Sequence, residues 1–207
     1  MSFELLEDLL QESARQHEHL CPRQVLGVRM GMLAADLLGL ALPLPRSDKR
    51  LLTIVETDGC FADGVSVATG CWVGHRTLRI VDYGKIAATF VDVPAETAIR
   101  VVPQASARER ASDYAPEIQD RWQAYLVGYG RMPFDELFTF QSIELAQDVR
   151  TIVSNPNARA VCDVCEEEIF NGREVLRAGR IVCRACAGQA YYRGPLNGGR
   201  GPGSNRP

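Results

Sequence analysis

The seven cysteines of this 207-residue chain separate into two groups with different chemistry. Four of them follow the spacing C-x2-C-x17-C-x2-C, and these are Cys162, Cys165, Cys183 and Cys186. Two residues between paired cysteines let one tight turn present both sulfurs to the same ion, and four thiolates complete the tetrahedral shell of zinc. The spacing therefore predicts one structural zinc ion per chain. Disulfides are the less favoured alternative, because the chain shows no secretory signal.

The segment around these four cysteines predicts a small, metal-dependent module. Residues 174–182 indicate a hairpin that turns at Ala178-Gly179, and a helix is expected to run from Cys183 to Tyr191 or Tyr192. Paired cysteines, a hairpin and a helix that carries the last ligands together resemble a treble-clef zinc finger. The module offers few large apolar side chains, so metal binding is expected to supply much of its folding free energy.

The other three cysteines lie in the first third of the chain, together with all three histidines. Pro22 favours the first position of a helix, which places Cys21 at the helix N-terminus. Unpaired amide donors and the helix dipole favour a thiolate there, so Cys21 is a candidate nucleophile or metal ligand. An extended segment before the proline projects His17 and His19 to the same side as Cys21. The competing interpretation, solvated histidines beside a buried core cysteine, carries equal weight.

A second group of polar residues follows a strand that is expected to end at Thr57. Loops at strand ends carry functional side chains on a rigid support. Cys60 is expected at the start of the next helix, with Asp63 in its first turn, so Cys60 is a further candidate nucleophile or ligand. Cys71 follows that helix, roughly 15 Å from Cys60 at about 1.5 Å per residue, and is expected to be structural. The alternative is that Cys60 and Cys71 are both plain core residues.

Composition and charge limit the classes of function. The chain is 46% hydrophobic and 24% charged, with a formal net charge of −3. These values fit one ordinary domain with an appendage, and they lack the basic character of a nucleic-acid-binding domain. The most apolar stretch, residues 25–40, is interrupted by Arg29 and Asp36 and is too short to cross a bilayer. Free cysteines and histidines without a secretory signal predict a cytoplasmic protein.

The order of periodic segments predicts an α+β fold with a mixed or antiparallel sheet and packed helices. Helices are expected at the N-terminus and over 22–39, 62–69, 105–112 and 116–128, and strands over 51–57, 77–81, 86–91, 98–102 and 138–145. The stripe Gly27, Gly31 and Ala35 is expected to pack on the sheet in preference to a dimer partner. The predicted organisation is a domain over 1–153, a linker over 154–160, the finger over 161–192 and a disordered tail over 193–207.

Several short motifs lie at expected helix and strand boundaries between about residues 10 and 145. They are His17-x-His19-x-Cys21-Pro22, Leu26-Gly27-Val28-Arg29, Glu56 through Asp63, Thr69-Gly70-Cys71 with Gly74, and Asp82-Tyr-Gly-Lys85. Together they are specific, and the chain resembles the formylmethanofuran dehydrogenase E-subunit-like family, several members of which also carry a C-terminal four-cysteine finger. The chain departs from the family pattern at Glu18, Arg23, Gly59, Gly64 and His75.

The resemblance implies an α+β domain, usually dimeric, with a cleft lined by the cysteines and histidines of the motifs, often near a bound metal. The family name comes from an association with the operon of a molybdenum or tungsten enzyme that acts on a one-carbon carrier. Many relatives occur where that pathway is absent, so the name does not by itself establish an activity. Arg23, beside the helix start, is expected to narrow the pocket or to contact an anion.

The leading functional hypothesis is a cytoplasmic metal-binding protein. Its cleft, built from His17, His19, Cys21 and Cys60, would hold a second transition metal or a metal-containing cofactor. Thiolate and imidazole ligands suit zinc, nickel, copper or iron rather than magnesium. The role would be accessory or enzymatic and linked to molybdenum- or tungsten-type or one-carbon redox metabolism. The expected partners are a second copy of the chain and a small-molecule or metal-cofactor ligand, with no membrane.

Two alternatives come from other classes of function. One is a thiol-dependent enzyme in which Cys60 or Cys21 is the nucleophile, Asp63 or a histidine is the base, and Lys85 is an electrostatic partner. The other is a regulator whose finger contacts nucleic acid or a polymerase. Glutamates offset the arginines of the finger, so nucleic acid is not an expected ligand on this pattern.

Overall fold

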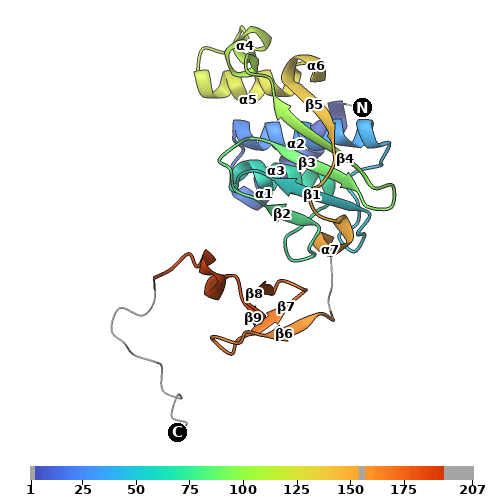
Figure 1. Cartoon of the computed structure of the whole chain (residues 1–207). Coiled ribbons are helices and arrows are strands. Elements are labelled where there is room, and N and C mark those ends of the chain that lie inside the picture. Colours follow the sequence, from blue (N-terminus) through green and yellow to red (C-terminus); the bar gives the residue numbers. More distant parts are fainter. Residues whose placement is uncertain (1–2, 154–156, 194–207) are drawn as a thin grey trace. The chain divides into compact units, whose positions relative to one another are not determined.

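A computed structural model describes residues 3–153 and 157–193 of the chain. The chain divides into two compact units, unit 1 (Met1–Val153) and unit 2 (Ser154–Pro207), which are described separately (Figure 1). Part of the expected linker 154–160 and nearly all of the expected disordered tail 193–207 lie outside the described residues.

A five-stranded sheet forms the centre of unit 1. Its strands are β1 (Leu51–Val55), β2 (Leu78–Ile80), β3 (Ala88–Asp92), β4 (Thr97–Pro103) and β5 (Phe138–Ile143). They are arranged in the order β2-β1-β3-β4-β5. The β1 and β2 strands are parallel, whereas the other neighbours are antiparallel. The prediction of an α+β fold with a mixed sheet and packed helices is therefore confirmed.

Helices gather in two groups around this sheet (Figure 1). The first group contains α1 (Phe3–His17), α2 (Pro22–Leu38) and α3 (Cys60–Thr69). The second contains α4 (Ala107–Arg110), the 3-10 helix η1 (Ala111–Tyr114), α5 (Arg121–Arg131) and α6 (Phe134–Leu137), and α7 (Val149–Val153) follows β5. None of the helices in the described ranges combines the length and the apolar run that a bilayer crossing requires.

The glycine stripe of α2 packs against α3, so the expectation that it faces the sheet is wrong. A Cβ atom on Gly27 would lie 2.4 Å from the carbonyl oxygen of Phe61, and one on Gly31 would lie 2.6 Å from the Cβ of Ala68. Gly64 of α3 is equally close to Gln24 of α2. Contacts advance in the same direction along both helices, so α2 and α3 are parallel and begin at the same end of the molecule.

The main core of unit 1 lies between these helices and the sheet. Its largest fully buried side chains include Phe61 from α3, Phe90 from β3, Met30 from α2 and Leu51 from β1. The fully buried β3 occupies the middle of the sheet, whereas most side chains of the edge strand β5 are exposed. Burial of this apolar surface holds α2 and α3 firmly in place and thereby fixes the positions of the residues at their N-termini.

Two helices of the second group are shorter than expected. The helix expected over 116–128 begins at Arg121, because the Asp120 side chain caps it by accepting a hydrogen bond from the Gln123 amide at 2.8 Å. The helix expected over 105–112 is divided into α4 and the 3-10 helix η1. These shifts matter for function, because α4 and α5 line the pocket described below.

The described residues of unit 2, 157–193, form two small hairpins and one short helical segment. The strands are β6 (Arg159–Val161), β7 (Glu168–Phe170), β8 (Val175–Arg177) and β9 (Arg180–Val182), and the helical segment is η2 (Ala185–Gln189). The β8–β9 hairpin turns at Ala178-Gly179, where both residues have positive φ. The helix expected to reach Tyr191 or Tyr192 ends at Gln189, because Gly188 has a φ of 97°.

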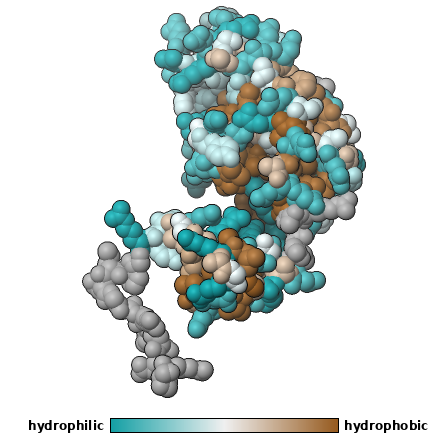
Figure 2. Space-filling model, viewed as in Figure 1, coloured by the Kyte–Doolittle hydropathy of each residue, from teal (hydrophilic) through white to brown (hydrophobic). Residues whose placement is uncertain are grey.

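Apolar groups reach the surface of the finger between polar ones, as Figure 2 shows. Leu176 is 74% exposed and Val161 is 58% exposed, whereas the small buried cluster consists of Cys162, Ile169 and Val182. So small a core contributes little hydrophobic stabilisation, which leaves the cysteine cluster as the main support of the module.

Candidate functional site

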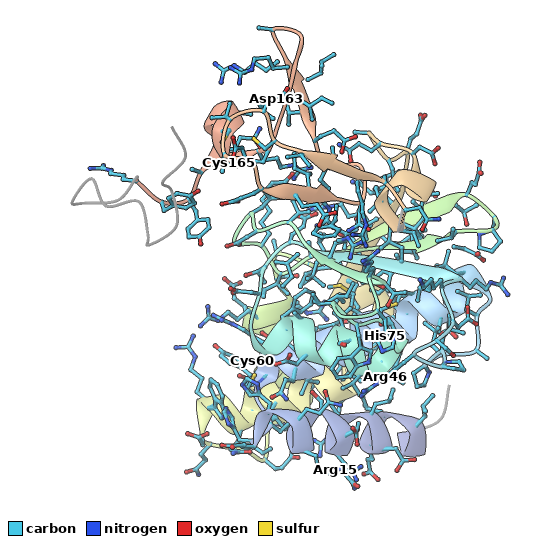
Figure 3. The ribbon with its side chains drawn as sticks, turned by 90° about the horizontal axis from the view of Figure 1, so that it is seen from below. Arg15, Arg46, Cys60, His75, Asp163 and Cys165 are labelled. Atoms are coloured by element: carbon cyan, nitrogen blue, oxygen red, sulfur yellow. The ribbon has the colours of Figure 1, made fainter. Side chains whose placement is uncertain are left out.

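The four cysteines of the finger converge into one cluster. Cys162 and Cys165 lie in the turn between β6 and β7, and Cys183 and Cys186 follow β9. The four sulfur atoms all lie within 4.8 Å of one another. Asp163 joins the two halves, because its carboxylate accepts a hydrogen bond from the Ile181 amide at 2.6 Å. Figure 3 labels Asp163 and Cys165 on this module.

The electrostatics of these thiols are compatible with a bound cation. Backbone amides donate to the Cys162 sulfur and lower the pKa of its thiol to about 6. The neighbouring thiols, Cys183 first, raise the pKa of Cys186 to about 12. Four thiolates so close together repel one another, and a bound divalent cation removes that repulsion. The geometry and the donor set therefore form a metal-binding cluster, as the spacing predicted.

In unit 1, Cys60 occupies the first position of α3 and owes this position to Gly59. Gly59 adopts φ 76° and ψ −157°, a backbone conformation that is essentially restricted to glycine. This turn carries the chain from the end of β1 into α3. Figure 3 shows Cys60 at the start of that helix, near α1.

Cys60, His17 and Asp63 form a continuous chain of polar contacts. The Cys60 sulfur lies 3.0 Å from Nε2 of His17. Nδ1 of the same ring lies 3.0 Å from a carboxylate oxygen of Asp63. If Nδ1 donates its proton to the carboxylate, Nε2 is left free to accept the proton of the thiol. A nucleophile, a base and a group that orients the base thus meet at one place.

Packing between α1 and α2 brings His17 to Cys60. Gln24 of α2 donates hydrogen bonds to the carbonyl and the hydroxyl oxygen of the buried Ser13 on α1, at 3.0 and 2.9 Å. The carbonyl oxygen of the Gln24 side chain accepts a hydrogen bond from the Cys21 amide at 2.8 Å. One buried side chain therefore fixes both the last turn of α1, which carries His17, and the start of α2.

The environment of Cys60 favours the protonated thiol. Burial raises the pKa of Cys60, and the adjacent Cys21 thiol raises it further. The expected preference for thiolate at a helix start is therefore outweighed at this position. Cys21 itself is buried at the N-cap of α2. Cys60 is consequently suited to a mechanism in which a base removes its proton during the reaction.

The structure leaves several of the sequence candidates outside this group. His19 lies beside His17, with ring centroids 4.9 Å apart and ring planes tilted by 58°, and is exposed. Lys85 lies 5.9 Å over the ring of Tyr83, and His75 is exposed in a turn. Cys71 is buried and hydrogen-bonded to Thr53 in the core. Among the described residues, the finger cysteines alone form a metal-sized group of three or more ligands; His17, His19, Cys21 and Cys60 do not.

A pocket of about 660 Å³ opens beside Cys60. Its walls come from the starts of α2 and α3, the end of β4, and helices α4 and α5. The lining residues are His19, Cys21, Pro22, Arg23, Leu26, Cys60, Ile86, Pro103, Gln104, Ala107, Arg108, Trp122, Tyr125 and Tyr129. Both candidate thiols of unit 1 therefore face the same cavity.

Sequence reasoning missed the wall that α4 and α5 contribute. Arg108, Trp122, Tyr125 and Tyr129 lie far from the cysteine and histidine motifs along the chain. The available signal was the pairing of Tyr125 with Tyr129, one helical turn apart, in a segment flanked by arginines. That signal could not distinguish a ligand-binding face from ordinary core packing.

Comparisons with known proteins place unit 1 in a family context. The profile of the family described as "FmdE, Molybdenum formylmethanofuran dehydrogenase operon" matches residues 16–139. A protein of Archaeoglobus fulgidus named "Probable S-adenosyl-L-methionine-binding protein" is 30% identical, over 90% of this chain and 54% of the relative. The chain thus spans about half the length of that relative.

The fold also matches a solved structure. This is the crystal structure of an FmdE-like protein, named for the tungsten formylmethanofuran dehydrogenase, from Syntrophus aciditrophicus. The match has a TM-score of 0.56 at 16% sequence identity, and it covers 91% of this chain and 95% of the other.

Proposed function

The chain belongs to the FmdE family, and from this premise we propose that unit 1 binds a small molecule in its Cys/His-lined pocket and acts on it through the Cys60 thiol. The role is linked to the one-carbon redox metabolism for which the family is named. One observation carries this proposal: the continuous contact from the Cys60 sulfur through His17 to Asp63, at 3.0 Å for each step.

The geometry suits nucleophilic attack on a carbonyl carbon. As the sulfur of Cys60 bonds to that carbon, Nε2 of His17 takes the thiol proton, and Asp63 stabilises the resulting imidazolium. The carbonyl π electrons move to oxygen. When they return, the bond to the leaving group breaks and His17 returns the proton to that group. The product is an S-acyl Cys60, which water or an acceptor then releases by the same sequence of steps.

The test is alkylation of Cys60 by iodoacetamide in the full chain, with the modified peptide identified by mass spectrometry. His17→Gln removes the base, so at pH 7 it should slow modification of Cys60 by at least about tenfold. At pH values above the raised pKa of Cys60 the thiol ionises without help, and the difference should shrink. The control is His75→Gln, since His75 is exposed in a turn and lies away from Cys60 (Figure 3). Equal rates in wild type and His17→Gln at pH 7 would remove the proposed role of His17.

Core metal binding is the second candidate function for the same residues. A histidine that ligates a metal usually donates its other ring N–H to a carboxylate, and His17 makes this contact with Asp63. Cys60 and Cys21 would be the thiol ligands, and binding would have to draw them closer to His17, because the three residues do not form a metal-sized group in this structure. This candidate requires more than one metal equivalent per chain, so elemental analysis of the full chain separates it from the thiol mechanism, which requires only the metal of the finger.

We assign zinc to the finger, because a closed set of four thiolates suits this ion best. It supplies no reactive position there and serves to hold the module folded. Both the finger and the Cys60 site need reduced thiols, which supports a cytoplasmic location.

A further inference from the structure

Two guanidinium groups line the pocket without a carboxylate to neutralise them. Arg23 projects from the second residue of α2, and Arg108 from α4. Among the described residues, none of the pocket-lining side chains is acidic, and neither arginine forms an ion pair. In a chain with a net charge of −3, such a place is locally positive. Arginines that face a cavity without a carboxylate partner favour an anionic ligand.

Three aromatic side chains of α5 form the adjacent wall. Tyr125 and Tyr129 stack with centroids 6.0 Å apart and ring planes 15° apart. Trp122, one turn earlier, is 52% exposed although it lines the pocket. An exposed indole beside two stacked phenol rings offers flat apolar surface to a planar ligand.

Two arginines, Arg121 and Arg108, lie against Tyr125 of this aromatic wall. Nε of Arg121 donates to the Tyr125 hydroxyl at 2.5 Å, and the Arg108 guanidinium lies 5.6 Å from the centroid of the same ring. The parallel helices α2 and α3 both begin at the pocket, so the positive ends of their dipoles add to this field. The side chains that favour an anion and those that favour an aromatic ring therefore line one cavity.

We propose that the pocket binds a planar aromatic compound that carries a carboxylate or phosphate group. Trp122, Tyr125 and Tyr129 contact the ring, and Arg23 and Arg108 hold the anionic group. The cavity of about 660 Å³ accommodates a ligand of mononucleotide size or larger. The inference rests on the proposed function, since it names the substrate class of the same pocket, but binding does not require the thiol.

The test is calorimetric titration of the full chain with three matched pairs of compounds. The pairs are adenosine 5′-monophosphate with adenosine, 2-naphthoate with 2-naphthamide, and indole-3-acetate with indole-3-acetamide. At least one anion should bind tenfold or more tightly than its neutral counterpart, as expected for a charge-assisted hydrogen bond.

Variants test whether the arginines bind the anionic group of the ligand and whether the aromatic side chains bind its ring. Arg108→Gln and Arg23→Gln should each remove most of the preference for the anion, while Trp122→Leu should weaken both members of a pair by about two- to tenfold. Arg46→Gln is the matched control: it removes the same charge, but Arg46 stacks on Trp72 and lies away from Cys60 (Figure 3).

The proposal is overturned if no anion of the three pairs binds more tightly than its neutral counterpart, or if Arg46→Gln loses as much affinity as Arg108→Gln. Calorimetry measures the affinity of the pocket for a ligand, whereas alkylation measures how the contact with His17 affects the reactivity of the Cys60 thiol. If binding is selective for anions but the alkylation rate does not depend on His17, the proposed ligand class stands and the thiol mechanism is excluded. If alkylation depends on His17 but no anion is preferred, the ligand class is excluded and the thiol mechanism stands.

Discussion

At the scale of single residues, the ion pair of Glu56 and Arg100 connects the end of β1 to β4. Nε and one terminal nitrogen of the Arg100 guanidinium donate to the two carboxylate oxygens at 2.5 and 2.7 Å. The Glu56 side chain is only 9% exposed and that of Arg100 is 24% exposed. Glu56 also precedes the loop that leads to Gly59 and Cys60, so this pair holds the base of the loop that carries the thiol.

The first prediction is that Glu56→Gln lowers the free energy of unfolding by about 2–3 kcal/mol at pH 7, because Arg100 loses its partner in a largely buried site. The hydrogen bond from Arg100 holds the pKa of Glu56 below its ordinary value of 4.5. A lowered folded-state pKa stabilises the protein above about pH 4.5, and this contribution is lost as the pH falls through the folded value.

Chemical denaturation of wild type and Glu56→Gln between pH 3 and pH 7 measures this effect, and the two curves should approach each other at acid pH. Glu117→Gln provides the control, since Glu117 pairs with Arg131 on the exposed surface and should change stability far less than Glu56→Gln does. A difference between wild type and Glu56→Gln that does not depend on pH would contradict the assignment.

At the scale of elements, the parallel packing of α2 and α3 decides the geometry of the site. Glycines at Gly27 and Gly64 let the two backbones approach closely, and the helices then begin side by side. Cys21 caps one helix and Cys60 starts the other. Two thiols from distant parts of the sequence are thereby brought to one cavity, together with two helix dipoles.

The second prediction concerns this packing. Gly27→Ala places a methyl group against backbone atoms of α3 that cannot move aside alone, so it should lower the free energy of unfolding by about 1–3 kcal/mol. It should also slow alkylation of Cys60 by displacing α3 from α1. Denaturation and alkylation of the same sample test both effects.

Gly130→Ala is the control for this substitution, because its Cβ would meet only the Leu6 side chain at an ordinary 4.0 Å within a regular helix. It should be neutral or stabilising by about 0.5–1 kcal/mol. Wild-type stability and alkylation in Gly27→Ala would show that the close approach of the helices is not required.

At the scale of the whole molecule, the chain consists of two units with different sources of stability. Unit 1 has an extensive apolar core, whereas the buried cluster in the described part of unit 2 consists of Ile169, Val182 and the cluster cysteine Cys162. The family profile covers residues 16–139 and does not extend to the cysteines of the finger. The two units should therefore respond independently to loss of the metal.

The third prediction is that Cys183→Ser releases the metal of the finger and unfolds unit 2 while unit 1 remains folded. Removing one thiolate opens the closed shell, and the small core does not compensate. Elemental analysis should show about one zinc equivalent less per chain, and NMR should show loss of the finger signals alone. Full zinc content in this variant would refute the assignment of the ligands.

The fourth prediction is that the full chain shows no salt-sensitive binding to duplex DNA at physiological ionic strength. Arginines of the finger already contact other groups of the finger: Arg159 pairs with Glu168, and Arg177 donates to the Ala187 carbonyl oxygen. At these two positions the existing contacts compete with phosphate contacts. Fluorescence anisotropy across a salt series measures this, and sub-micromolar binding that disappears with the finger would establish a regulator instead.

Local patterns determined much of what the sequence alone could say about this protein. The spacing of Cys162, Cys165, Cys183 and Cys186 was sufficient for the cluster, since all four ligands lie in short turns whose geometry depends on a few neighbouring residues. Pro22 similarly placed Cys21 at a helix start. Periodicity and glycine positions were sufficient for the α+β class and for most of its helices and strands.

Tertiary structure alone decided which residues meet. The contact of His17 with Cys60 depends on three helices packing together, and the contribution of Arg108, Trp122 and Tyr125 depends on α4 and α5 folding toward the same cavity. Such contacts join residues that are tens of positions apart, and they arise from burial of the shared core. Sequence periodicity records which face of a helix is apolar, but it does not record which other helix covers that face.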